Sequence, residues 1–329
     1  MELSEIKSGT LFYDIHAVVD QKSTNTTKTG KLYADITLKA GNCSLKCKKW
    51  SYNAEKYDGL LAPGKTVKVA GEASLYLGEL QATLNTVESS ERSPDEFARR
   101  TKFDVEAIYV KILAIVNSFQ EDLPKYIAKE LLTKYKKEFQ TCPAALGVHQ
   151  AWFGGLIEHT YNMLNLALPI INYYQNEYGI KSFSRDKVLF GVVMHDFGKI
   201  FEYDCSSPAF KMRPEGVLLN HIMRGSLLIH DTANYWYEKV VPPHPGGILV
   251  RNEFERERDI LVHLIASHHG KHEFGSPQLP SCLEAVLLHY IDMIDSHMMP
   301  AVELVEGKPG QIDGFSERCR IEKAQYIQN

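Results

Sequence analysis

The hydrophobic pattern of this 329-residue chain changes its period near residue 90, and that change limits the fold more than any other feature. Before it, short segments rich in β-branched and aromatic residues partly alternate between apolar and polar side chains, which predicts strands. The predicted strands cover residues 11–20, 31–40, 43–50, 66–74 and 79–88, with turn sequences between them. Five such strands suit a small closed barrel, and the five-stranded barrel that they predict is the OB-fold.

After residue 90 the apolar residues recur every three to four positions, which predicts helices. A polar, proline-containing stretch separates the two patterns. Helices are expected over residues 105–119, 124–139, 154–174, 185–199, 220–240, 256–269 and 279–299. The predicted fold class is therefore multidomain, with an all-β OB-fold barrel at 1–90, a linker at 91–104, an all-α domain at 105–300 and a tail at 301–329.

Composition narrows the class of protein. No apolar run approaches the roughly 20 residues that a transmembrane helix needs, and the acidic N-terminus lacks the pattern of a secretory signal. The six cysteines are scattered apart from Cys43 and Cys47, so the chain lacks the paired spacing of a zinc site. We therefore expect a cytoplasmic protein with reduced cysteines and no membrane partner.

The net charge of −4 argues against a generic binder of polyanions, so any nucleic-acid surface must be a local patch. The tightest candidate is Lys46, Lys48 and Lys49, which end on Trp50. OB-folds bind single strands with aromatic side chains that stack on bases and cations that contact phosphates. Trp50 and Tyr76 are the predicted stacking residues, although a barrel of this kind could instead bind a protein.

Histidines and aspartates interrupt the apolar pattern of several predicted helices. They are His159, His195, Asp196, His221, His268, His269 and Asp292. A single histidine on an apolar face is usually a satisfied core residue, but burying this many polar groups is costly unless something binds them. A divalent metal ion would bind them, through neutral imidazole nitrogens and ionised carboxylates.

The adjacent pair His195 and Asp196 is the most specific part of this set. A carboxylate has two oxygens, so Asp196 could bridge two ions. Gly198 predicts that the helix ends just after the pair, and Lys199 supplies a cation able to hold a phosphate oxygen. These parts together indicate metal-assisted hydrolysis of a phosphodiester.

The order of these residues resembles the H…HD…D signature of the HD superfamily, read here as His159, His195-Asp196 and Asp292. The phrases GGLIEHT, HDFGK, NHI, SHHGKHEFGSP and LHYIDMID resemble those of the YhaM-type 3′→5′ exoribonucleases. That family also carries an OB-fold ahead of an HD domain. The resemblance covers the chain up to about Pro300 and implies that residues 105–300 form an HD-type phosphohydrolase domain.

The resemblance also implies roles for single residues. The ligands of one ion would be His159, His195, Asp196 and Asp292. Those of a second ion would be His221 and His268, with Asp196 as the bridge and His269 either a further ligand or a supporting residue. Asp196 and Lys199 would be the catalytic residues, with Lys199 binding phosphate or handling a proton. Manganese is the first candidate for the two divalent ions, and iron, cobalt and nickel are the alternatives.

Other residues near these motifs have two readings. His149 and Lys271 are candidate substrate contacts, with a surface role as the alternative for each. Residues 241–258, rich in proline and glycine, are expected to form a lid over the site or to line the path of a strand. His289 shares a helix face with Asp292 and is a candidate to orient a ligand. Asp295, one turn further along the same face, is a weaker candidate.

The predicted function is that of a metal-dependent 3′→5′ exonuclease that hydrolyses single-stranded RNA, or alternatively DNA, to nucleoside monophosphates. Single-stranded nucleic acid would be the partner, and the resemblance favours RNA. A first alternative is an HD phosphohydrolase acting on a small or cyclic nucleotide, with the barrel recruiting a partner. A regulatory nucleic-acid-binding protein with a vestigial metal site and a mixed-valence iron oxygenase are further alternatives, and a homo-oligomer is left open.

Overall fold

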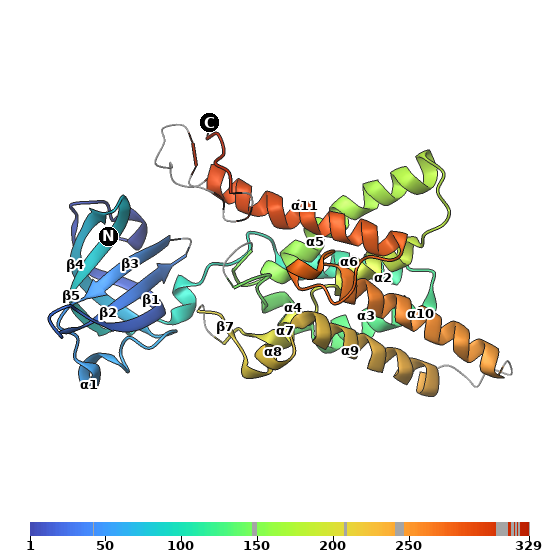
Figure 1. The fold of residues 1–329 in the computed structure, drawn as a ribbon, viewed down its shortest axis with the longest axis horizontal. Helices are drawn as coiled ribbons and strands as arrows, with labels where there is room; N and C mark the ends of the chain where they lie inside the picture. The colour runs from blue at the N-terminus through green and yellow to red at the C-terminus, as the bar shows by residue number, and fades with distance from the viewer. Residues whose placement is uncertain are drawn as a thin grey trace. The chain divides into compact units, whose positions relative to one another are not determined.

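The computed structural model describes residues 1–41, 43–146, 150–206, 209–240, 247–306, 315–316, 319, 321 and 323–328, with the backbone alone at 247–249. The chain forms two compact units. One comprises Met1–Arg100 and Cys205–Lys211, and the other comprises Thr101–Asp204 and Met212–Asn329. Each unit is described by itself below (Figure 1).

The first unit is built on a closed five-stranded barrel. Its strands are β1 (Leu11–Thr26), β2 (Leu32–Ala40), β3 (Cys43–Lys49), β4 (Thr66–Tyr76) and β5 (Glu79–Ser89). The order around the barrel is β1-β2-β3-β5-β4, and β4 pairs with β1 to close it. The pair β3–β5 is parallel and the others are antiparallel. This is the OB topology that the five strand patterns predicted.

Alternation along the strands fills the barrel with apolar side chains. Ile36 and Leu38 of β2 and Leu45 and Cys47 of β3 are buried, while the residues between them face outward. The barrel closes tightly at Gly71, where the register of β4 against β5 shifts. A Cβ there would overlap the carbonyl oxygen of Thr83 in β5, so only glycine allows the two backbones to approach so closely.

In its described residues the second unit is mainly helical, with an isolated bridge between Phe315 and Ile327. A two-stranded sheet pairs β6 (Tyr203–Asp204) with β7 (Lys211–Met212). The main helices of this unit are α2 (Val105–Asn117), α3 (Asp122–Lys134), α4 (Lys136–Thr141), α5 (Gly155–Asn172), α6 (Arg185–Met194), α7 (Lys199–Glu202), α8 (Pro214–Leu218), α9 (His221–Tyr235), α10 (Gly247–Ser267) and α11 (Leu283–Val305). The predicted class, an OB barrel followed by a helical domain, is confirmed. No helix in the described residues is long and apolar enough to cross a membrane.

Helix α6 forms the centre of this unit. Every residue from Val188 to Met194 is buried, and the helix contacts α3, α5, α10 and α11. A helix that is apolar all round must be covered on every side. Gly191 allows α11 to approach, since a Cβ at this position would lie 2.9 Å from the Leu288 side chain. The C-terminal end of α6 is therefore held deep inside the unit.

Several predicted boundaries differ from the structure. The helix expected over 185–199 ends at Met194, and a turn precedes the short α7. The helix expected over 124–139 divides at Tyr135 into α3 and α4. Part of the stretch predicted to be a lid, residues 247–258, is the N-terminal part of α10, while residues 241–246 lie outside the described part of the chain.

Candidate metal centre and nucleic-acid interface

The helical unit brings the predicted ligands together in two groups of three donors. The first donor group is His159, His195 and Asp292, and the second donor group is His221, His268 and His269. Within each group the donor atoms all lie within 4.8 Å of one another. All six residues were singled out from the sequence, and the structure gathers them from five separate helices or helix ends.

Helix ends supply most of these side chains. His195 follows α6, His221 begins α9, and His268 and His269 follow α10, whereas His159 and Asp292 lie within α5 and α11. The start of α9 lies directly against the turn after α6. A Cβ at Gly198 would overlap the carbonyl oxygen of His221, so this glycine is required by close packing and not only by a helix end.

Asp196 lies between the two donor groups. Its Oδ2 is 3.4 Å from His195 Nε2 and 4.0 Å from His159 Nε2. Its Oδ1 is 3.5 Å from His221 Nε2 and 3.7 Å from His268 Nε2. One carboxylate oxygen therefore faces each group, which is the arrangement that a bridging ligand requires.

The five imidazoles share one orientation of their ring nitrogens. Each Nδ1 is within hydrogen-bond distance of an oxygen that can only accept. The partners are Asp295 for His159, Val192 O for His195, Glu202 for His221, Ile265 O for His268 and Phe274 O for His269. A proton on Nδ1 leaves the lone pair on Nε2. Nε2 is the nitrogen that faces Asp196 in His159, His195, His221 and His268.

Three buried polar atoms at this centre have no hydrogen-bond partner among the described residues. They are Asp196 Oδ1, His221 Nε2 and His268 Nε2. Burial of unpaired polar atoms costs free energy, and a cation would satisfy all three. The set of nitrogen and carboxylate oxygen donors also suits divalent ions. The residues present therefore fit a site for divalent metal ions.

The pKa shifts of several of these residues favour the states that bind metal ions, which are ionised carboxylates and neutral imidazoles. Burial opposes ionisation of Asp196, but the adjacent Lys199 ammonium holds the pKa of this carboxyl well below its usual value. Burial also lowers the pKa of His268 and His269, so both are neutral at neutral pH. His159 differs, since its hydrogen bonds with Asp292 and Asp295 outweigh burial and raise its pKa to about 10. An ion binding there would displace a proton.

Lys199 lies against Asp196 inside the unit. It is 7% exposed, and its Nζ is 2.5 Å from Asp196 Oδ2 and 2.6 Å from the carbonyl oxygen of Ala144. Its charge is thus directed at the carboxylate that joins the two donor groups. A direct contact of Lys199 with substrate phosphate stays a prediction.

The two predicted substrate contacts have different outcomes. His149 lies outside the described residues. Lys271 is exposed in the loop after His269, with its Nζ 3.6 Å from Glu273 and 5.2 Å from the Phe274 ring centroid. The same loop holds a donor, because the Phe274 carbonyl oxygen lies 2.8 Å from His269 Nδ1. Lys271 is therefore an exposed residue two positions after the donor His269.

Other polar residues support the centre, and the sequence pointed to only some of them. His289 Nδ1 is 2.8 Å from the carbonyl oxygen of His268, and Asp295 pairs with His159, as both residues' places on the Asp292 face suggested. Glu202 and Gln150 were not identified from the sequence. The sequence pointed to polar residues within apolar helical patterns, and these two residues lie in segments without such a pattern. The one sequence feature that could have indicated Glu202 is its place in the polar HDFGKIFE segment, a few residues after His195 and Asp196.

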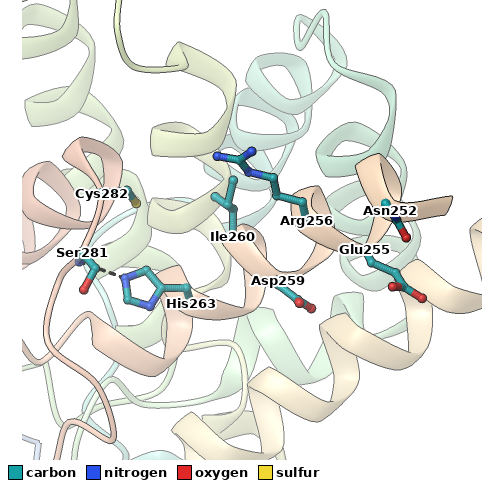
Figure 2. Close-up of a pocket in the computed structure, with 8 residues that line it drawn as sticks. All are labelled: Asn252, Glu255, Arg256, Asp259, Ile260, His263, Ser281 and Cys282. Carbon is teal, nitrogen blue, oxygen red and sulfur yellow. Dashed lines mark hydrogen bonds between the residues drawn. The ribbon is translucent and has the colours of Figure 1, made fainter. Parts of the chain in front are cut away.

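His263, which lies five residues before His268, has a different environment. Its Nε2 accepts a hydrogen bond from the Ser281 backbone N–H at 3.0 Å. It lines a shallow surface pocket on α10 together with Arg256, Asp259 and Cys282, as Figure 2 shows. The residues that line this pocket include none of the donors, so it is distinct from the candidate metal centre.

Two of the predicted lysines lie on the outward face of the barrel. Lys46 and Lys48 alternate with the buried Leu45 and Cys47, and they border a groove that crosses β1, β2, β3 and β5. Lys49 has the opposite parity along β3. Its Nζ donates to the carbonyl oxygen of Asn85 and lies 5.5 Å from the Tyr57 ring centroid. Alternation along the strand could have separated Lys49 from Lys48 in advance.

The two predicted aromatic residues are both exposed, and Trp50 lies beside a lysine of this groove. Trp50 is 44% exposed, with its ring centroid 5.0 Å from that of Tyr33 and 5.7 Å from Lys48 Nζ. Tyr76, 59% exposed, is opposite Glu79 in the β4–β5 pairing, and Glu79 forms an ion pair with Lys46. The barrel thus presents an exposed tryptophan ring beside a lysine, the combination that single-strand binding uses.

Comparison with known proteins agrees with this architecture. Residues 156–296 match the family model described as HD domain. The OB barrel and the histidine and aspartate donors therefore define an HD-domain protein with an N-terminal OB-fold. The chain is a homologue of the 3′-5′ exoribonucleases YhaM over almost its whole length, so the resemblance found in the motifs is confirmed.

The similarity to individual proteins is as follows. The YhaM of Geobacillus sp. (strain WCH70) is 29% identical over 310 residues, which cover 93% of this chain and 88% of the relative. That of Bacillus pumilus (strain SAFR-032) is 29% identical over 312 residues, covering 93% and 90%. A solved domain of replication protein A from Methanococcus maripaludis is 20% identical with a TM-score of 0.24, covering 28% of this chain and 98% of that chain.

The candidate metal centre predicts a metal-dependent stability. A divalent ion that binds only the folded protein should raise the free energy of unfolding by about 2.7 kcal/mol per site at a free concentration one hundred times its Kd. Thermal unfolding of the full chain with Mn²⁺ and with EDTA measures this effect. The His195→Ala/His221→Ala variant, which lacks a donor in each group, should lose most of it. An unfolding temperature that is the same in Mn²⁺ and EDTA would count against the centre.

Proposed function

We propose that this protein is a metal-dependent 3′→5′ exonuclease that degrades single-stranded RNA to nucleoside monophosphates. The observation that carries the proposal is the position of Asp196, with one oxygen toward each donor group. The relatives that match 93% of the chain are named 3′-5′ exoribonucleases, which supports the direction and the RNA substrate.

The proposed centre uses two divalent ions, with manganese as the first candidate and iron, cobalt or nickel as alternatives. His159, His195 and Asp292 would hold one ion, the three histidines of the second donor group would hold the other, and Asp196 would contact both. Ions bound there would act as Lewis acids toward a phosphodiester oxygen and would activate water at neutral pH.

The chain's own side chains prepare this centre for hydrolysis. The Lys199 ammonium, fixed between Ala144 O and Asp196 Oδ2, keeps the central carboxylate ionised and oriented. Because both groups are buried, their attraction is screened by water far less than a surface ion pair. Lys199 also adds positive charge to a centre at which a phosphodiester would develop negative charge.

The outward face of the barrel would bind the strand upstream of the terminal nucleotide. Trp50 and Tyr76 offer exposed rings for base stacking, which contributes roughly 1–3 kcal/mol per base. Lys46 and Lys48 are paired with Glu79 and Asp35 at 2.5 Å each, so phosphates would have to replace these carboxylates. The exposed pair Lys46–Glu79 contributes little stability, whereas Lys48–Asp35 is half-buried.

The same ion pairs favour one alternative function. A face whose lysines are already neutralised attracts nucleic acid less strongly than one with free lysines. An HD phosphohydrolase that acts on a small or cyclic nucleotide, with the barrel recruiting a partner, would have no need of a strongly cationic face. An assay of which substrate the protein hydrolyses distinguishes the two functions.

A time course on single-stranded RNA and DNA, labelled at the 3′ or the 5′ end, tests the proposed function directly. With Mn²⁺, we expect label from the 3′ end to appear first as nucleoside monophosphate, from RNA in preference to DNA, and no product with EDTA. If neither strand is cut with Mn²⁺, Co²⁺ or Fe²⁺, while a cyclic or small nucleotide is hydrolysed, the alternative function is correct.

The central carboxylate provides a second test. Asp196→Asn should lower the hydrolysis rate by about a thousandfold or more, beyond the 10–100-fold that changes in supporting residues cause, while strand binding by the barrel remains. Asp186→Asn is a matched control, because Asp186 is also buried but accepts hydrogen bonds from the backbone N–H groups of Gln120 and Glu121. A high residual rate in Asp196→Asn would exclude the proposed bridge.

The two sides of β3 provide a third test. Lys46→Ala should weaken binding of single-stranded RNA and reduce the slope of log affinity against log salt by about 0.7, the value for one phosphate contact on a single strand. Lys49→Ala removes the same charge from the opposite face and should leave the slope unchanged. Fluorescence anisotropy at several salt concentrations measures both, and equal effects would mean that the groove does not bind the strand.

A further inference from the structure

The histidines of the two donor groups differ in what holds their Nδ1 atoms. In each group one imidazole is held by a buried carboxylate, and the others are held by backbone carbonyl oxygens. We infer that Asp295 and Glu202 are positioning residues, each dedicated to one of the two metal positions. This inference rests on the proposed metal centre. It implies that a substitution can weaken metal binding at one position and leave the other unchanged.

Asp295 serves the first donor group. It is 5% exposed, and its Oδ2 is 2.6 Å from His159 Nδ1. It lies three residues after Asp292 on α11, so one face of one helix supplies both a donor and the support for another donor. Both carboxylates therefore move with α11 as a unit, and the His159 ring is held between them.

A second contact fixes Asp295 in turn. Gln150 Nε2 donates to Asp295 Oδ2 at 3.0 Å from a fully buried position. Gln150 has φ of 42°, and its carbonyl oxygen accepts the Ala144 N–H. A Cβ at Gly155 would overlap that carbonyl, so the start of α5 packs directly against it. The backbone of Gln150 is thus fixed by these contacts, and its side-chain amide reaches Asp295 from that position.

Glu202 serves the second donor group from a different part of the fold. It ends α7, is 5% exposed, and its Oε2 lies 2.9 Å from His221 Nδ1. Its backbone carbonyl accepts the Arg213 N–H at 2.9 Å. Helix α8 packs on it closely, since a Cβ at Gly216 would lie 2.6 Å from the Glu202 carbonyl oxygen and 3.0 Å from its Cγ. Glu202 therefore has a fixed side chain as well.

A carboxylate does more for a ligand histidine than a carbonyl does. Both fix the proton on Nδ1, but only the carboxylate adds a charge-assisted hydrogen bond that makes Nε2 a stronger donor. Loss of such a partner typically weakens metal binding by 10–100-fold. Because Asp295 and Glu202 lie on different helices and support different groups, the two effects should be separable.

The test uses the full-length protein and Mn²⁺ alone, with binding measured by equilibrium dialysis and by electron paramagnetic resonance. Asp295→Asn should weaken one of two Mn²⁺ ions by about 10–100-fold and leave the other unchanged. Glu202→Gln should do the same to the other ion. At Mn²⁺ concentrations between the two affinities, the spectrum of a magnetically coupled pair should change to that of an isolated ion.

Double variants assign each ion to its group. Asp295→Asn combined with His195→Ala affects one group twice, so the second ion should remain with wild-type affinity. Asp295→Asn combined with His221→Ala affects both groups, so both ions should be weakened. The inference requires that losses of Mn²⁺ binding free energy be non-additive for two substitutions in one donor group. They should be additive for substitutions in different groups.

Matched controls separate positioning from general stability. Asp186→Asn and Glu284→Gln also neutralise buried acids, which accept the backbone N–H groups of Glu121 and Ser184 and contact none of the donors. They should lower the unfolding temperature without changing Mn²⁺ stoichiometry. Should Asp295→Asn fail to fold, Gln150→Ala removes the support of Asp295 without altering a carboxylate, and it should weaken the same ion by a smaller factor.

The outcomes are distinct. If Asp295→Asn and Glu202→Gln each weaken both ions equally, or neither weakens any ion, the assignment of one carboxylate to each position is wrong. If the wild-type protein binds none of Mn²⁺, Fe²⁺, Co²⁺ and Ni²⁺, the proposed centre itself is wrong and this inference falls with it. Selective loss of one ion in each variant supports the inference even if the RNA substrate proves to be different.

Discussion

The buried charge of Asp196 is the constraint on which the helical unit depends. A carboxylate in a protein interior is strongly destabilising unless it is paired and hydrogen-bonded. Here the Lys199 ammonium lies 2.5 Å from one oxygen, and histidines from two directions surround both oxygens. The pairing alone leaves Oδ1 without a partner among the described residues, which is why the surrounding donors are best understood as a site for cations.

The apolar core and the polar centre of this unit are parts of one arrangement. Helix α6 is covered by neighbouring helices, so the residues that follow its C-terminal end are almost completely buried and are met by polar groups from those helices. Tight packing at Gly191 and Gly198 brings α11 and α9 close enough to supply them. Buried carboxylates and carbonyls then orient the rings, so that chemistry would require little rearrangement of the protein.

The charged groups of the barrel lie at its surface, unlike the buried polar centre of the helical unit. The groove of the barrel presents lysines that are already paired with carboxylates, so the strand binding proposed there would depend on exchange of partners and on aromatic surface rather than on strong net charge. Weak, exchangeable contacts would suit the proposed function, in which a strand moves as nucleotides are removed. A buried and fixed centre suits a reaction that requires constant geometry. The homology to YhaM exoribonucleases extends over both units.

The local sequence determined the elements and most of the donors. Period-two and helical patterns depend only on neighbouring residues, and polar side chains such as His159 stand out within apolar helices, while the motifs supplied the family. Tertiary structure alone decided that α6 ends at Met194, that Lys49 contacts Tyr57, and that Glu202 supports His221. It also joined Gln150 to Asp295, 145 positions apart. Contacts of that kind have no local signature, because they arise only when packing brings distant segments together.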